Sequence, residues 1–176
     1  TGFRGEEFKK CTYGELGKYE TVDQIEAARY LASLPYVDPD RIGIYGWSYG
    51  GFMALNCILK GNDVFRAAIA VAPVTSWRFY DTIYTEIYNG LPQDNPSGYD
   101  DNSPIHFADR LKGNLLLIPG TGDDNVHIQN TYEMITRLVE YDKPFELYVY
   151  PDRNHGMGPS RHHLMERCIE FVQRNL

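Results

Sequence analysis

The sequence lacks three features, and each absence argues against one class of protein or one kind of site. No run of about 18 apolar residues is present, so no stretch of the sequence is long enough to cross a membrane as a helix. The formal net charge is −7, whereas a nucleic-acid-binding protein would be expected to carry a basic patch. The three cysteines are an odd number without the spacing of metal ligands. We therefore expect neither a nucleic-acid partner nor a metal site, and we expect Cys57 and Cys168 to be buried thiols.

The chain does have the length and the apolar content of one domain, with 176 residues of which 43% are hydrophobic. Apolar runs typical of buried strands alternate with segments of helical spacing. The predicted strands are residues 41–45, 67–72, 114–118 and 145–150. The predicted helices are residues 21–34, a helix that follows Ser48 and ends near Lys60, residues 132–141, and a last helix from Ser160. This alternation predicts an α/β fold with a mostly parallel sheet flanked by helices.

Two segments are predicted to be irregular. The start of the chain, with Gly2 and Gly5, is expected to be a loop that leads to Thr21 as the N-cap of the first helix. Residues 73–110 are rich in Tyr, Pro, Asn and Asp and are expected to form one long irregular insertion. Long loops of this kind frequently carry function.

A pattern of strand, sharp turn and helix surrounds Ser48. The apolar run 41–45 leads directly into Gly-Trp-Ser-Tyr-Gly-Gly (46–51), and a strand that ends in Gly-x-Ser-x-Gly turns sharply into a helix with the serine hydroxyl exposed. Gly46 and Gly50 fit this geometry because neither has a Cβ that could clash where strand and helix pass close together. An ordinary glycine-rich turn remains the alternative, since short motifs have a real false-positive risk.

Candidates for a base and an orienting acid follow two later strands. Asp123 and Asp124 come after strand 114–118, and His155 comes after strand 145–150. The order serine, aspartate, histidine is that of the α/β-hydrolases. In such a triad the histidine takes the serine proton, and the carboxylate fixes the histidine tautomer. Position alone leaves Asp123 and Asp124 as alternatives. The other histidines do not follow a strand and are expected to be structural or exposed: His106, His127, His162 and His163.

Longer motifs together resemble the C-terminal catalytic region of the dipeptidyl peptidase IV group, in the prolyl oligopeptidase family of serine peptidases. They are Gly-Trp-Ser-Tyr-Gly-Gly (46–51), Ala-Pro-Val (72–74) with Trp77, Tyr80-Asp81, Tyr84-Thr85-Glu86 and Asp-Asp-Asn-Val-His (123–127). The resemblance covers almost the whole chain. It implies that residues 1–176 are the C-terminal part of an α/β-hydrolase domain. The first strands of that domain and an N-terminal β-propeller would lie outside this sequence.

The resemblance implies roles for single residues. It makes Asp123 the acid of a triad with Ser48 and His155, and Asp124 would then be a helix cap. Tyr49 would supply one oxyanion donor through its backbone N–H, which helix geometry also favours, and a tyrosine upstream of Thr1 would supply the second. The substrate pocket would be formed by Tyr49, Val74, Trp77, Tyr80, Tyr84 and Val126, with Asn125 holding a substrate carbonyl. Without the resemblance, the aromatic residues would be read as core packing and Asn125 as a turn residue.

The activity implied by the resemblance is the removal of N-terminal dipeptides after proline or alanine, without a cofactor. The substrates would be peptides. The longer protein to which residues 1–176 would belong is expected to be a homodimer that uses its last helix in the contact. Related proteins are secreted, periplasmic or membrane-anchored. The alternatives are a general α/β-hydrolase esterase or acylaminoacyl peptidase, a tripeptidyl peptidase and a module without turnover. Because parts of the site would lie upstream, residues 1–176 alone are expected to be inactive.

Overall fold

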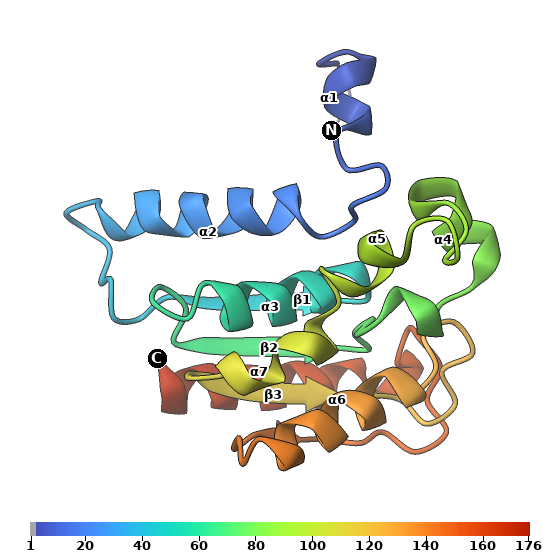
Figure 1. Cartoon of the computed structure of the whole chain (residues 1–176). Helices are drawn as coiled ribbons and strands as arrows, with labels where there is room; N and C mark the ends of the chain where they lie inside the picture. Colours follow the sequence, from blue (N-terminus) through green and yellow to red (C-terminus); the bar gives the residue numbers. More distant parts are fainter. Residues whose placement is uncertain (1–2) are drawn as a thin grey trace.

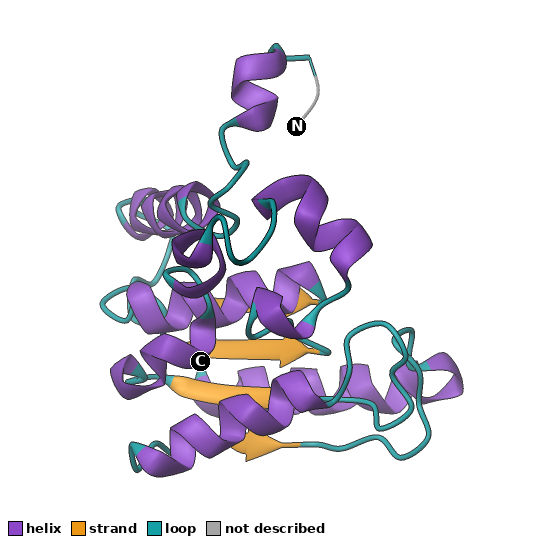
Figure 2. Ribbon diagram, turned by 45° about the vertical axis from the view of Figure 1, so that its right-hand side comes forward, coloured by secondary structure: helices purple, strands orange, loops and turns teal. Residues whose placement is uncertain are grey.

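The computed structural model describes residues 3–176 as a parallel four-stranded sheet with helices on both faces (Figures 1 and 2). The strands are β1 (Gly43–Trp47), β2 (Ala67–Val71), β3 (Asn114–Ile118) and β4 (Glu146–Leu147), in the sheet order β1-β2-β3-β4. The α-helices are α1 (Glu6–Lys10), α2 (Tyr19–Ala32), α3 (Tyr49–Lys60), α4 (Thr82–Asn89), α5 (Pro96–Asp100), α6 (Gln129–Glu140) and α7 (Arg161–Asn175). The 3-10 helices are η1 (Trp77–Phe79), η2 (Pro104–Arg110) and η3 (Gly158–Ser160). The predicted fold class is confirmed.

The two central strands are buried on both faces, which explains their continuous apolar sequences. Alternate residues of each strand point to opposite faces. Ala68 and Leu115 lie in a core shared with α2, α3 and α6, whereas Ile69 and Leu116 lie in a second core shared with α7. Both sheet faces are thus covered by helices.

All neighbouring strands are parallel, so their carboxyl ends lie at one edge of the sheet. Trp47 is aligned with Val71, and Val71 is aligned with Ile118. The loops that follow β1 and β3 leave the sheet at this edge, as does the chain after β4. Open parallel sheets commonly bind ligands outside the carboxyl ends of their strands.

Strand β1 has a partner strand on one side only among residues 3–176. Gly43 and Tyr45 are exposed there. An apolar groove of about 230 Å³ lies beside them, and its other lining residues include Phe171 and Leu176 near the end of α7. The strand that leads to Ser48 therefore forms an open edge of the sheet.

The first long helix begins earlier than predicted. Helix α2 starts at Tyr19 with Lys18 in the N-cap position, so Thr21 is not the cap. Thr21 is instead buried in the first turn, and its hydroxyl donates to the carbonyl oxygen of Gly17. A threonine at the start of an apolar pattern can thus bond backward within the helix as well as cap it.

The prediction that residues 73–110 form an irregular insertion is wrong. This segment contains α4 and α5 together with η1 and η2. Asp81 caps α4 by accepting the N–H of Tyr84 at 2.7 Å, and Asn95 caps α5 by accepting the N–H of Gly98 at 3.2 Å. The polar residues that suggested a loop are therefore partly helix caps.

Regular strand structure in residues 145–150 is shorter than predicted. Pairing with β3 nevertheless continues, because the N–H of Tyr148 donates to Leu117 O and that of Tyr150 donates to Pro119 O, both at 3.0 Å. Pro119 has no N–H to donate in return, which interrupts the ladder.

Gly5 lies in a loop as predicted, but the loop does not continue to the first long helix, because α1 begins directly after Gly5. The five residues of α1 carry acidic side chains in the first turn and basic ones in the last, and Glu6 pairs with Lys10 at 3.2 Å. This order of charges favours a helix. Gly2 lies outside the described residues.

The predicted burial of Cys57 and Cys168 is confirmed, and both thiols are free. Within residues 3–176, no helix combines the length and the apolar character needed to span a bilayer.

Candidate active site

Ser48 lies in a strained turn between β1 and α3. Its backbone has φ 60° and ψ −118°, a sparsely populated conformation that costs a residue other than glycine about 1–3 kcal/mol. Residues strained in this way cluster at functional sites. The turn is fixed by hydrogen bonds on both sides, since the Ser48 N–H donates to Val71 O at 2.9 Å and Ser48 O accepts from Phe52 N–H at 3.0 Å.

Of the two glycines predicted to avoid a clash near Ser48, the structure confirms Gly46 and contradicts Gly50. A Cβ on Gly46 would lie 1.9 Å from the carbonyl oxygen of Gly50, so strand and helix can approach only because residue 46 is glycine. A Cβ on Gly50 would meet no atom within 4 Å, so the predicted clash at that residue is wrong. A Cβ on Gly51 would lie 2.9 Å from Pro73 Cβ, and Gly51 is therefore the second position where space is short.

Asp123 and His155 form a hydrogen-bonded pair. His155 Nδ1 lies 2.8 Å from Asp123 Oδ2, and the other Asp123 oxygen accepts the backbone N–H groups of Asn125 and Val126 at 3.0 and 2.9 Å. The Asp123 side chain is 1% exposed and that of His155 is 23% exposed. A carboxylate that accepts from Nδ1 leaves the other ring nitrogen free to accept a proton.

Asp124, the other candidate acid, is exposed, and among residues 3–176 no hydrogen bond or ion pair joins it to His155. It does not cap a helix, because α6 begins at Gln129 and its N-cap position is held by Ile128 without a side-chain hydrogen bond. Of the two aspartates, Asp123 is therefore the one that contacts His155.

The loop that carries His155 is attached to the residue before Ser48. Trp47 Nε1 donates to the backbone carbonyl of His155 at 3.0 Å. Among the hydrogen bonds of residues 3–176, none joins Ser48 Oγ to the imidazole. Catalytic hydrogen bonds are commonly long before a substrate binds. The structure thus places Ser48 and His155 on neighbouring loops.

A small cavity of about 90 Å³ opens beside Ser48. Its walls are Tyr49, Val74, Trp77, Tyr80 and Tyr84. The Trp77 and Tyr84 rings are stacked with centroids 5.8 Å apart, and Tyr80 meets Tyr84 edge to face at 5.3 Å. Burial raises the pKa of Tyr84 to about 12, so this phenol is neutral at physiological pH. The walls are therefore aromatic and uncharged.

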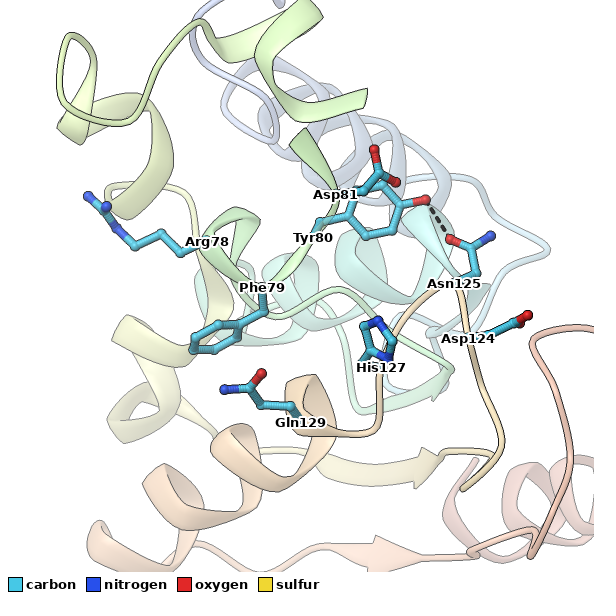
Figure 3. A pocket seen from close by; sticks show the side chains of 8 residues that line it. All are labelled: Arg78, Phe79, Tyr80, Asp81, Asp124, Asn125, His127 and Gln129. Atoms are coloured by element: carbon cyan, nitrogen blue, oxygen red, sulfur yellow. Dashed lines mark hydrogen bonds between the residues drawn. The ribbon is translucent and has the colours of Figure 1, made fainter. Parts of the chain in front are cut away.

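Val126 and Asn125 lie next to this cavity in different ways. Val126 is buried in the apolar cluster that also contains Val74 and Trp77. Asn125 is exposed, and its Oδ1 accepts the hydroxyl of Tyr80 at 2.6 Å (Figure 3). Because the amide oxygen is occupied by Tyr80, the amide N–H groups of Asn125 remain as donors.

A larger open hollow of about 730 Å³ adjoins the small cavity, and Tyr80 lines both. Its lining residues carry many polar groups (Figure 3) and are Arg78, Phe79, Tyr80, Asp81, Asp124, Asn125, His127 and Gln129. The sequence predicted no role for Arg78 or Gln129. Glu20, which accepts the Tyr49 hydroxyl at 2.6 Å, was also missed.

Comparisons with known proteins show which family the chain belongs to. The model of the prolyl oligopeptidase family, Peptidase_S9, matches residues 1–176. The chain is 48% identical over 161 residues to a Paracoccidioides brasiliensis protein named "Probable dipeptidyl-aminopeptidase B". The aligned region covers 89% of this chain and 18% of that protein. A similar fungal protein from Emericella nidulans is 44% identical over 178 residues, covering 98% of this chain and 20% of that protein.

A solved structure of dipeptidyl peptidase 4 from Porphyromonas gingivalis matches with a TM-score of 0.96 and 50% identity, over 98% of this chain and 25% of the other. The chain thus spans about a fifth to a quarter of the length of these relatives. Since the family match extends over every residue, this chain belongs to the prolyl oligopeptidase family.

Proposed function

We propose that this chain is the C-terminal part of the peptidase domain of a longer protein, called the parent below, whose remaining parts include a β-propeller. The parent would be a serine exopeptidase that releases N-terminal dipeptides from peptides with proline or alanine in the second position. One observation carries this proposal: the aromatic cavity of about 90 Å³ is lined by Ser48 itself, and the neighbouring Trp47 is hydrogen-bonded to His155, which in turn pairs with Asp123.

The proposed reaction begins at Ser48. Its Oγ attacks the substrate carbonyl while His155 takes the hydroxyl proton, and Asp123 stabilises the imidazolium and fixes its tautomer. The backbone N–H of Tyr49 is the proposed donor to the oxyanion, because it begins helix α3 directly after Ser48. His155 then returns the proton to the leaving amine, and water releases the dipeptide from the acyl-enzyme.

The size of the cavity supports a small residue at the cleaved bond. The cavity beside Ser48 is small, about 90 Å³ compared with about 730 Å³ for the adjoining open hollow. A pyrrolidine ring or a methyl group suits this volume, and uncharged aromatic walls suit an apolar ring. The free amide N–H groups of Asn125 are the proposed donors to a substrate carbonyl.

The experiment that tests the proposal compares substrates. The parent is expected to cleave a Gly-Pro anilide with kcat/KM at least about 100-fold above that for an N-acetylated Gly-Pro anilide, because a dipeptidyl peptidase needs a free amino terminus. A missing polar interaction of this kind costs a factor of about 10² or more. Equal rates on both anilides, or a preference for short acyl esters, would favour the esterase or acylaminoacyl-peptidase alternative.

We also propose that the parent is a homodimer that uses α7 and that it acts outside the cytoplasm, as secreted, periplasmic or membrane-anchored relatives of the family do. The dimer proposal is supported by an apolar stripe on α7. Met165, Ile169 and Val172 lie at helical spacing and are 43%, 54% and 41% exposed. Cell fractionation tests the location.

Ile169→Asp is expected to convert the parent to a monomer, as measured by light scattering after size-exclusion chromatography. Placing an unpaired charge in an interface costs about 2–5 kcal/mol, which weakens association by at least about 30-fold. Val139→Asp is the matched control, because Val139 is 65% exposed on α6, away from α7. A dimer that survives Ile169→Asp would exclude this face as the contact.

A further inference from the structure

A carboxylate from the start of α2 reaches the wall of the aromatic cavity. The Tyr49 hydroxyl donates to Glu20 Oε1 at 2.6 Å. Both Glu20 oxygens also accept the backbone N–H of Gly17, at 3.2 and 3.1 Å. Tyr49 is 29 residues away along the chain, so this contact connects the segment before α2 with the residue that follows Ser48.

The direction of this hydrogen bond is set by the chemistry of the two groups. Burial, and next the hydrogen bond to Glu20, raise the pKa of Tyr49 far above its ordinary value. The phenol therefore keeps its proton and is the donor. A hydrogen bond to an ionised acceptor is roughly twice as strong as one between neutral groups.

The segment that carries Glu20 is itself held against the end of α4 and against the Phe52 side chain. The N–H of Gly14 donates to Tyr88 O at 2.6 Å, and the N–H of Leu16 donates to Asn89 Oδ1 at 3.3 Å. A Cβ on Gly17 would lie 2.4 Å from the Phe52 ring, so the backbone rests directly on that side chain. Glu20 therefore presents its carboxylate from a rigid position.

The Tyr49 ring has mainly apolar contacts apart from its hydroxyl. Its centroid lies 5.4 Å from that of Phe52 and 5.6 Å from that of Trp77. Such contacts leave more than one ring orientation open, whereas a hydrogen bond at the tip of the ring selects one. Since the ring is a wall of the cavity beside Ser48, its orientation helps to set the size of that cavity.

We propose that Glu20 is a positioning residue: it holds the Tyr49 ring as a wall of the cavity and thereby restricts the residue before the cleaved bond to a small side chain. This inference rests on the proposed function, because it assigns the cavity to that residue. Glu20 acts through Tyr49 and does not itself touch the substrate.

The test measures kcat/KM of the parent on Gly-Pro, Gly-Ala and Gly-Leu anilides. Glu20→Ala and Tyr49→Phe should each lower the ratio of Gly-Pro to Gly-Leu by about tenfold, which corresponds to the loss of one charge-assisted hydrogen bond. The double variant should match the single ones, because both changes break the same interaction. Glu20→Gln keeps an oxygen that can accept the phenol and should restore most of the ratio.

Two controls separate positioning from general damage. Glu26→Ala makes the same change on the exposed side of α2, where Glu26 pairs with Arg29, and should leave the ratio unchanged. The rate of labelling by a fluorophosphonate should stay within about twofold in the Glu20 and Glu26 variants, since neither residue lines the cavity beside Ser48.

Tyr49→Phe keeps Glu20 and its bonds to Gly17, so it tests the proposal even where Glu20→Ala does not fold. An unchanged ratio in Tyr49→Phe, or additive effects in the double variant, would overturn the role of Glu20 while leaving the proposed function in place. A wild-type parent without turnover of Gly-Pro anilide would overturn the proposed function, and this inference with it.

Discussion

Ser48→Ala is expected to reduce kcat of the parent on Gly-Pro anilide by about 10⁶-fold, the loss found when the nucleophile of a serine peptidase is removed. The same variant should not react with a fluorophosphonate, which forms a covalent bond to an activated serine. The fold should be unchanged, because alanine at φ 60° has the same backbone strain as serine and the Ser48 side chain does not cap α3. Activity and labelling are measured beside the free energy of unfolding.

Ser97→Ala is the matched control for this experiment. Ser97 is exposed on α5 and lies outside the candidate site, so its replacement should change neither activity nor labelling. Labelling that persists in Ser48→Ala would show that another residue is the nucleophile. Absence of labelling in the wild-type parent would favour a module without turnover.

Asp123→Asn is expected to lower kcat by about 10⁴-fold with little change in KM, as for the same change in other serine triads. The asparagine oxygen can still accept the N–H groups of Asn125 and Val126, so the turn should persist. Its amide nitrogen, however, would donate toward His155 Nδ1 and favour the tautomer in which the other ring nitrogen carries the proton. That tautomer cannot accept the proton of Ser48. The pre-steady-state rate of acylation is the direct measurement.

Asp124→Asn is the comparison that separates the two candidate acids. Asp124 is exposed and has no hydrogen bond or ion pair with His155 in the described part of the chain, so its neutralisation should change kcat by no more than about threefold, the size of a surface electrostatic effect. If Asp124→Asn lowered kcat as much as Asp123→Asn does, the assignment of Asp123 as the acid of the triad would be contradicted.

The turn at Ser48 could be predicted from the sequence because its cause is local. An apolar strand followed at once by Gly-x-Ser-x-Gly constrains the backbone within a few residues. The prediction that Gly50 avoids a clash was wrong because the clash depends on the direction in which a Cβ would point. A Cβ on Gly46 would point at the Gly50 backbone, whereas a Cβ on Gly51 would point at Pro73.

The helices between β2 and β3 were missed because their sequences mix turn-forming residues with short apolar stretches. Helix α5 has five residues, too few to show a period. Two helix starts were nevertheless visible in the sequence. Aspartate and asparagine are preferred at N-caps, which fits Asp81 and Asn95, and proline is preferred at the first helical position, which fits Pro96. These capping residues are local features of the sequence, but they were interpreted as loop residues.

Other features depend on contacts that no sequence period encodes. Position after β3 left Asp123 and Asp124 equal, and only the turn that brings two N–H groups to one Asp123 oxygen directs the other oxygen to His155. The bond between Glu20 and Tyr49 joins two different helices and depends on the approach of Gly17 to Phe52. Neither contact follows from composition or spacing.

The open side of β1 has a consequence for handling residues 1–176 as a separate polypeptide. In the part of the chain that the structure describes, no strand pairs with the backbone donors and acceptors on that side of Gly43–Tyr45, and the groove beside them is lined mainly by apolar side chains that can bind another copy. Copies of such a polypeptide would add to one another through this margin and precipitate. A lysine placed at the outward position of Tyr45 would discourage such stacking, as charged side chains do on the margins of natural sheets.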